Sequence, residues 1–245
     1  MPGQRYARRL NDLEQRFIAL AESIPDSPEK EAISVLHGMI QEVWRSFSGS
    51  APAGRAPSEL TLEDIASLYK TAPEMRGEAI CEPLPVGTPA PDFTLRDPNN
   101  EPVTLSDFRG RPVVLVFYPL DWSPTCSDQL SLYQAEISEF ERFGAQILGI
   151  SVDSIYCHGA WAAVRGLRFP LLADFEPKGE VARLYKVYRE PDGFSERALY
   201  VVDPEGIIRY AHVSPRLDMI PDIYELYQVL SEITGLPAPA PTTVA

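Results

Sequence analysis

The stretch that decides the fold is Val113–Gln129, VVLVFYPLDWSPTCSDQ. Its first part, Val113–Tyr118, is a continuous apolar run rich in β-branched and aromatic residues, which is typical of a parallel strand buried on both faces. Pro119 ends the run, because proline cannot continue a central strand. Cys126 follows seven residues later and directly precedes apolar residues at helical spacing. The sequence therefore predicts a cysteine in the first turn of a helix that follows a buried strand.

This position has chemical consequences for the thiol. A helix start offers unpaired backbone N–H groups and partial positive charge, and both stabilise a thiolate. Cys126 is therefore the candidate nucleophile, and its ordinary alternative is an inert buried cysteine. The hydroxyl of Ser123, three residues earlier, can cap the helix or bond to sulfur and to a substrate oxygen. Pro119 is a candidate for shielding the pocket, or simply ends the strand.

Composition and charge exclude several classes of protein. A chain of 245 residues with 44% hydrophobic residues suffices for one large domain, or for one domain and an extension. Its 22 basic and 35 acidic residues leave a net charge of −13, so no nucleic-acid partner is expected. No apolar stretch reaches the roughly 18 residues of a membrane helix, and no secretory signal is apparent, so no membrane partner is expected.

Three widely spaced cysteines do not form a secreted disulfide framework, and they indicate a reducing cytoplasm. The three histidines are scattered without ligand spacing, so we expect no metal and no cofactor.

The first third of the chain differs from the rest. Residues 1–48 carry two apolar stripes at helical spacing, which predict a helical hairpin. Residues 49–83 read as a linker that contains a short helix ending near Lys70. The stripes of the hairpin need a cover, which is either the chain's own domain or another subunit of a homodimer or larger homo-oligomer.

The region 84–236 alternates strands and helices, which predicts an α/β, thioredoxin-like fold: a central mixed sheet flanked by helices, with an N-terminal α-helical extension. In such sheets the site lies beyond the carboxyl ends of the strands. Residues 237–245 read as a loose Pro-rich tail. After a hairpin near Asn99, the expected strands are 113–118, 146–151, 170–173, 198–203 and 207–213, and the expected helices are 127–143, 157–165, 178–185 and 220–234.

Several blocks of this region resemble the peroxiredoxins, the thiol-specific antioxidant and alkyl hydroperoxide reductase superfamily. Pro119, Ser123 and Cys126 match the pattern of Pro, three residues, Thr or Ser, two residues, Cys. The blocks Phe169–Tyr188 and Ser195–Tyr210 resemble the alkyl hydroperoxide reductase E type. The resemblance implies a peroxidase that reduces hydrogen peroxide and organic hydroperoxides. Its peroxidatic cysteine becomes a sulfenic acid, and a thioredoxin-like, glutaredoxin-like or low-molecular-weight thiol reductant recycles it.

Arg197 is the candidate charge partner of the thiolate. It starts the apolar stretch ALYVVD, and a charge that enters a buried strand is costly unless it is paired. A guanidinium beside a thiolate stabilises it and can hold peroxide oxygens, and the resemblance places the family's active-site arginine here. The ordinary alternative is a surface ion pair with Glu196 or Asp192. Arg183 and Arg209 are weaker candidates, because their positions suit solvated charges.

Two further cysteines leave the recycling step open. Cys157 comes 31 residues after Cys126, at the end of the next predicted strand, and is the candidate resolving cysteine. A disulfide requires Cα atoms within about 7 Å, so the loop would have to open. The type that the chain resembles has no resolving cysteine, which leaves a one-cysteine mechanism, Cys157 and, third, Cys81 as alternatives. We interpret His158 as a structural or capping group.

Two other functions remain as alternatives. A thioredoxin-like thiol–disulfide oxidoreductase has the same fold but needs Cys-x-x-Cys, whereas position 123 is Ser and position 129 is Gln. A non-enzymatic holdase or scaffold would use the helices of residues 1–48 instead of the thiol.

Overall fold

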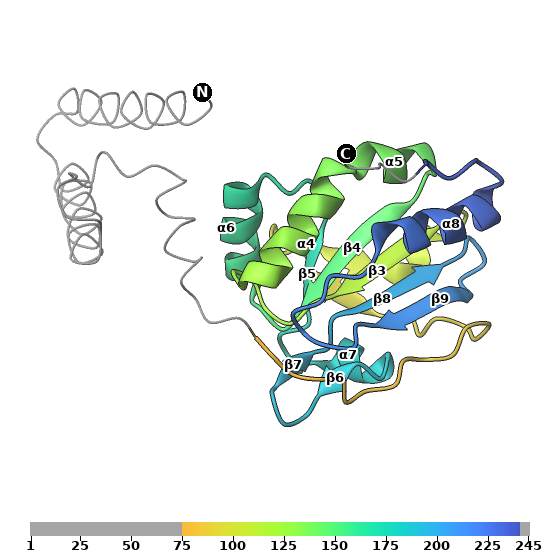
Figure 1. Cartoon of the computed structure of the whole chain (residues 1–245). Helices are drawn as coiled ribbons and strands as arrows, with labels where there is room; N and C mark the ends of the chain where they lie inside the picture. The colour runs from red at the N-terminus through yellow and green to blue at the C-terminus, as the bar shows by residue number, and fades with distance from the viewer. Residues whose placement is uncertain (1–74, 241–245) are drawn as a thin grey trace, which may run out of the picture. The chain divides into compact units, whose positions relative to one another are not determined.

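The computed structural model describes residues 75–240. The strands of its mixed sheet are β1 (Thr94–Arg96), β2 (Pro102–Thr104), β3 (Val113–Phe117), β4 (Gln146–Ser151), β5 (Leu171–Ala173), β8 (Ala198–Val202) and β9 (Ile208–Val213). Their order across the sheet is β2–β1–β5–β4–β3–β8–β9 (Figure 1). The helical hairpin predicted for residues 1–48 and the short helix ending near Lys70 lie outside the described residues.

The register of the central strands determines where the site can lie. β3 and β4 run parallel, with Phe117 opposite Ile150. β8 runs antiparallel to β3, with Phe117 opposite Ala198. The loop that leaves β3, the loop that leaves β4 and the residue that precedes β8 therefore meet at one edge of the sheet. At this edge the loop before Cys126 lies between the loop before Cys157 on one side and Arg197 on the other.

Helices cover both faces of the sheet because its central strands are buried on both sides. The helices are α4 (Pro124–Ala135), α5 (Ile137–Arg142), α6 (Ile155–Arg165), α7 (Glu180–Leu184) and α8 (Ile223–Thr234), with a 3-10 turn η2 (Leu105–Phe108). On β3, Val114 and Val116 face the core under α4, α5, α6 and α8, whereas Leu115 and Phe117 face the core under α7. Burying each such side chain contributes roughly 1.5–3 kcal/mol.

The predicted mixed sheet flanked by helices is confirmed, and most predicted elements differ from the observed ones by no more than three residues at either end. The single helix predicted for residues 127–143 is wrong. Helix α4 begins at Pro124 and ends at Ala135, because Glu136 leaves the helical conformation with φ −94° and ψ 12°. At this break Glu136 accepts a hydrogen bond from the Tyr227 hydroxyl of α8 at 3.1 Å, a tertiary contact that no local sequence signal announces.

A short hairpin of β6 (Tyr188–Arg189) and β7 (Phe194–Ser195) was not predicted. Each strand has two residues, which is too short for a periodic pattern. None of the helices within residues 75–240 is long and apolar enough to cross a membrane.

The segment Met75–Cys81, which we call the N-terminal strap, packs against the domain although it falls in the predicted linker. The Ala79 N–H donates to the Pro215 carbonyl at 2.9 Å. The Leu217 N–H donates to the Gly77 carbonyl at 3.0 Å. The packed part of the chain thus begins before Leu84, the first residue of the predicted domain.

Candidate active site

Cys126 is the third residue of α4 and is fully buried. Pro124 occupies the first turn, where its lack of an N–H costs nothing and its φ suits a helix. Ser123 is the N-cap, and its Oγ accepts a hydrogen bond from the Cys126 N–H at 3.3 Å. The predicted helix-start position of Cys126 is confirmed, and so is the capping role of Ser123.

Arg197 lies directly against the sulfur. Its side chain is fully buried, and Nη2 donates to Sγ of Cys126 at 3.4 Å. Nε donates to the Leu217 carbonyl at 2.9 Å, and Nη1 donates to Oε1 of Gln129 at 2.5 Å. The guanidinium is thus held by two neutral acceptors and presents its remaining edge to the thiol. A positive group beside sulfur in a site closed to water favours the thiolate.

The alternative of a surface ion pair for Arg197 is wrong. Glu196 and Asp192 instead pair with Arg189, at 3.0 Å and 2.5 Å. The weaker candidates form partly exposed pairs away from the thiol: Arg183 with Glu190 and Arg209 with Asp203.

Two buried polar residues of α4 complete the site and were missed from the sequence. Gln129 accepts from Arg197 and donates from Nε2 to the Tyr133 hydroxyl at 3.1 Å. Burial raises the pKa of Tyr133 to about 12, against the opposing effects of Gln129 and of the Arg197 charge, so the phenol stays protonated at neutral pH. The signal that could have found Gln129 is its spacing of three residues from Cys126, which places both on one helix face.

The loop between β3 and α4 holds Ser123 in place. Pro119 is buried, and β3 ends at Phe117, before the proline. Trp122 has φ 64°, an uncommon left-handed conformation for a side chain of this size, and such backbone strain concentrates at functional sites. Trp122 also packs against the apolar cluster that contains Cys126.

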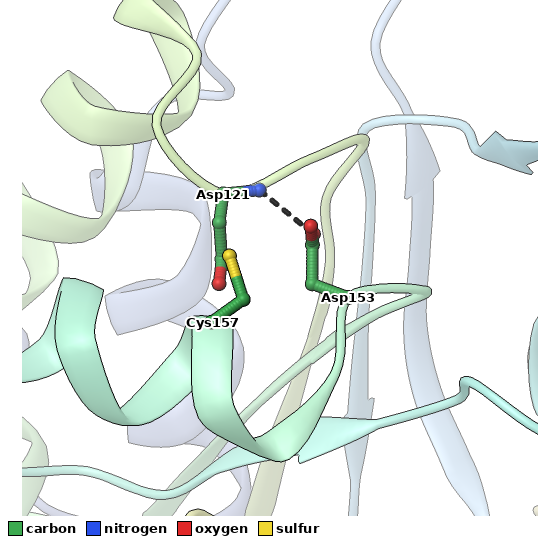
Figure 2. Close-up of side chains that lie close together, drawn as sticks. All are labelled: Asp121, Asp153 and Cys157. Carbon is green, nitrogen blue, oxygen red and sulfur yellow. Dashed lines mark hydrogen bonds between the residues drawn. The ribbon is translucent and has the colours of Figure 1, made fainter.

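Cys157 occupies the corresponding position of the neighbouring helix. It is the third residue of α6, and the capping Ser154 accepts its N–H at 3.3 Å. Figure 2 shows its Sγ beside the carboxylate of Asp121. Burial and then the charge of Asp121 raise the pKa of Cys157 to about 12, with Asp153 adding to the effect. The Cys157 thiol is therefore protonated at neutral pH.

Asp121 ties the active-site loop to the start of α6. It accepts from the Tyr118 hydroxyl at 2.9 Å and bonds Nδ1 of the buried His158 at 2.9 Å. Its N–H donates to Asp153 at 2.8 Å (Figure 2). The burial of His158 and its bond to Asp121 are consistent with the interpretation of His158 as a structural group.

Potential cation ligands gather at the same place. Among residues 75–240, ligand atoms of Asp121, Asp153 and Cys157 lie within 4.8 Å of one another. The carboxylates already accept hydrogen bonds from the protein, including one from the Ser151 hydroxyl at 2.7 Å, and these bonds account for the cluster.

Cys81 lies apart from this loop, in the N-terminal strap. Its Sγ donates to the Tyr188 carbonyl at 3.2 Å. Burial and the charge of Glu196 raise the pKa of Cys81 to about 11. All three cysteines, which the described residues include, are free thiols.

The site suits a sulfur nucleophile that reacts with a small substrate out of contact with water. A single buried thiol beside an arginine distinguishes it from a dithiol centre, in which two cysteines of one helix turn exchange with a disulfide. The fold and the site together define a thioredoxin-like, thiol-based peroxidase.

Comparison with known proteins identifies the family. The AhpC/TSA family profile matches residues 86–211, and the chain belongs to this family, the peroxiredoxins. Alkyl hydroperoxide reductase E of Mycobacterium tuberculosis (strain ATCC 25618 / H37Rv) is 44% identical over 131 residues, which cover 53% of this chain and 86% of that protein. Peroxiredoxin-1 of Gallus gallus is 36% identical over 135 residues, covering 51% of this chain and 68% of that protein.

Solved structures agree with the family and the fold. A reduced 2-Cys peroxiredoxin of Plasmodium vivax superposes with a TM-score of 0.57 at 27% identity, covering 62% of this chain and 83% of that chain. The predicted thioredoxin-like fold and thiol-dependent peroxidase activity are confirmed, and the thiol–disulfide oxidoreductase and holdase alternatives are not favoured.

Proposed function

We propose that Cys126 is the peroxidatic nucleophile of this peroxidase, and that its substrates are hydrogen peroxide and organic hydroperoxides. The observation that carries the proposal is the 3.4 Å bond from Arg197 Nη2 to Sγ of a fully buried cysteine at a helix start. Helix N–H groups and a guanidinium then act on the same sulfur, and both favour the thiolate that attacks a peroxide.

The proposed step is a displacement on oxygen. The Cys126 thiolate attacks one peroxide oxygen, so an S–O bond forms while the O–O bond breaks. The departing oxygen leaves as hydroxide or alkoxide and takes up a proton, which yields water or an alcohol and a sulfenic acid on Cys126. Arg197 stabilises the charge that develops on the oxygens, because a preorganised donor needs no rearrangement during reaction.

Ser123 and Pro119 have supporting roles in this proposal. The Ser123 hydroxyl has acceptor capacity beyond its bond to the helix N–H, and it can accept a hydrogen bond from the O–H of a bound hydroperoxide. Pro119 is buried in the loop before it and, having no N–H, offers the peroxide no competing donor.

For recycling, we propose that an external thiol reductant of the thioredoxin, glutaredoxin or low-molecular-weight class reduces the sulfenic acid. Cys157 remains the second candidate, since α4 and α6 both begin at the same edge of the sheet. Its thiol, however, is held protonated beside Asp121, and a protonated thiol is a poor nucleophile. This supports a one-cysteine mechanism over a Cys126–Cys157 disulfide, and over Cys81 as resolving cysteine.

The proposal also includes the assembly and compartment of the protein. Apolar stripes in residues 1–48 support a homodimer or larger homo-oligomer, because they need a cover. Three free cysteines support a reducing cytoplasm.

Mass spectrometry of the intact full chain after one equivalent of peroxide tests the site and the recycling route together. We expect one added oxygen on Cys126 in the wild type and in Cys157→Ser, and loss of peroxide consumption in Cys126→Ser. Wild-type turnover by Cys126→Ser would disprove the nucleophile. A disulfide that disappears in Cys157→Ser would make Cys157 the resolving cysteine, and one that disappears only in Cys81→Ser would give that role to Cys81.

A further inference from the structure

We propose that the N-terminal strap, Met75–Cys81, positions the catalytic Arg197 against Cys126. The inference rests on the roles proposed above for these two residues. The strap lies outside residues 86–211, the part of the chain that the family profile matches. Two routes of hydrogen bonds lead from the strap to Arg197, one through Leu217 and the other through Glu196.

The first route passes through a single residue. Arg197 Nε donates to the Leu217 carbonyl at 2.9 Å, and the Leu217 N–H donates to the Gly77 carbonyl of the strap at 3.0 Å. Two residues before Leu217, the Pro215 carbonyl accepts from the Ala79 N–H at 2.9 Å. The strap therefore fixes the segment that supplies the acceptor of Arg197. If that segment shifts, the guanidinium shifts with it.

The second route starts at the residue next to Arg197. Glu196 is 1% exposed, and its Oε1 accepts the N–H groups of Ile80 at 2.8 Å and Cys81 at 3.2 Å. Arg189 Nη1 bonds both carboxylate oxygens at 3.0 Å. The same Nη1 also donates to a strap carbonyl, that of Glu78, at 2.9 Å. The buried carboxylate of Glu196 accepts these four hydrogen bonds and thereby holds the strap to the residues just before β8.

Arg197 needs such support because its side chain is long and its charge is buried. An arginine side chain has about 2 kcal/mol of rotamer entropy to lose, and only fixed acceptors select one orientation. A displacement of about 1 Å at a catalytic group can cost on the order of a hundredfold in rate. The 3.4 Å contact with sulfur is thus sensitive to the backbone that holds Leu217 and Glu196.

Glu196 can act on Cys126 through its charge or through the position of Arg197, and these two effects shift the pH profile of the peroxide reaction in opposite directions. Neutralising Glu196 removes a negative charge, which through space alone would stabilise the Cys126 thiolate and move the pH profile of the peroxide reaction to lower pH. Loss of the Arg197 contact would move it to higher pH. The strap also carries Arg76 and Glu78, which interact with Arg216 and Asp218. Other charged or titratable groups around Glu196, Arg197 and the strap include Arg189, Asp192, Glu190, Cys81 and Tyr133.

The first experiment uses Ala79→Pro in the full chain, with Ala79→Gly as its matched partner. Proline removes the N–H that Pro215 accepts and changes no charge, whereas glycine keeps this N–H. Stopped-flow measurement of the Cys126 reaction with hydrogen peroxide across pH should show about a tenfold slower reaction in Ala79→Pro, with its pH midpoint raised. In Ala79→Gly, both the rate and the pH midpoint should change less than in Ala79→Pro.

The second experiment compares Glu196→Gln with Glu190→Gln. The second variant breaks the exposed pair with Arg183, which the structure holds at 2.7 Å, and should leave the pH midpoint unchanged. Glu196→Gln should slow the reaction about tenfold and raise the midpoint. If Glu196→Gln does not fold, the pH midpoint of Ala79→Pro by itself tests whether the strap positions Arg197.

Two results would overturn the inference. One is a folded Ala79→Pro with a lower melting temperature but an unchanged pH midpoint, since a merely structural strap would behave in this way. The other is a Glu196→Gln midpoint that falls, which would make the effect one of charge. Either result leaves the peroxidase assignment intact, provided that Cys126→Ser is inactive in the same assay.

Discussion

Cys126 and Arg197 form a pair in which the charge matters because water is excluded. Both residues are fully buried, so no solvent screens the guanidinium from the sulfur. Gln129 and the Leu217 carbonyl bond the other guanidinium nitrogens without neutralising the charge. The positive charge is therefore directed at the sulfur and at any oxygen bound beside it.

Removing this charge should slow the first chemical step. We expect Arg197→Ala to react with hydrogen peroxide at least about tenfold more slowly, which corresponds to about 1.4 kcal/mol, with its pH profile displaced to higher pH. Arg197→Lys keeps a charge but loses the fork that bonds Gln129 and Leu217 together, so it should recover only part of the rate. Stopped-flow kinetics over the acidic to neutral range measure both. Unchanged rate constants in the folded alanine variant would remove Arg197 from the site.

At the scale of elements, α4 and α6 present two cysteines in the same local geometry but in opposite electrostatic surroundings. Each helix follows a strand of the parallel β3–β4 pair, has a serine N-cap and carries its cysteine at the third position. Cys126 faces Arg197, whereas Cys157 faces Asp121 and Asp153. The helix start alone therefore does not decide which thiol is reactive.

This contrast leads to a prediction of how fast the Cys157 thiol is alkylated and how that rate depends on pH. With its pKa at about 12, the thiolate fraction at neutral pH is small and should rise about tenfold for each unit of pH. Asp153→Asn removes one of the charges that raise this pKa, so at fixed pH it should speed alkylation about threefold or more. Peptide mapping after timed iodoacetamide treatment separates Cys157 from Cys81. An equal rate in both proteins would show that burial alone controls this thiol.

On the scale of the molecule, the bonds described for the site fall between residues 75 and 217. We therefore expect deletion of residues 1–57 to leave the peroxide reaction of Cys126 within a few-fold of wild type, while the oligomeric state or solubility changes. The two apolar stripes of residues 1–48 are the reason for the second expectation, at roughly 1.5–3 kcal/mol per large side chain buried. Stopped-flow kinetics and light scattering on the truncated protein measure both.

Extending the deletion to residue 81 gives a sharper comparison, because it also removes the N-terminal strap. This longer deletion should slow the reaction, since it takes away the Gly77 carbonyl that holds Leu217. A folded 1–57 deletion that scatters like the full chain but has lost peroxide reactivity would show that the first residues complete the site.

The sequence by itself determined the order of the main strands and helices and the position of Cys126 at a helix start. Apolar runs, helical spacing and cap residues are local signals, and they suffice to predict β3 and a helix that carries Cys126 in its first turn. Arg197 could also be identified from the sequence as a candidate site residue, because a charge at the start of an apolar strand needs a partner.

Only the tertiary structure decided what these residues meet. Arg197 lies 71 positions from Cys126 and 68 from Gln129, and the strap residue Ile80 lies 116 from Glu196. The residues of these pairs come together because the fold buries them at one edge of the sheet. Their spacing along the chain does not predict that they are in contact. The break of the helix at Glu136 and the acidic surroundings of Cys157 have the same origin, since both depend on contacts between elements distant in sequence.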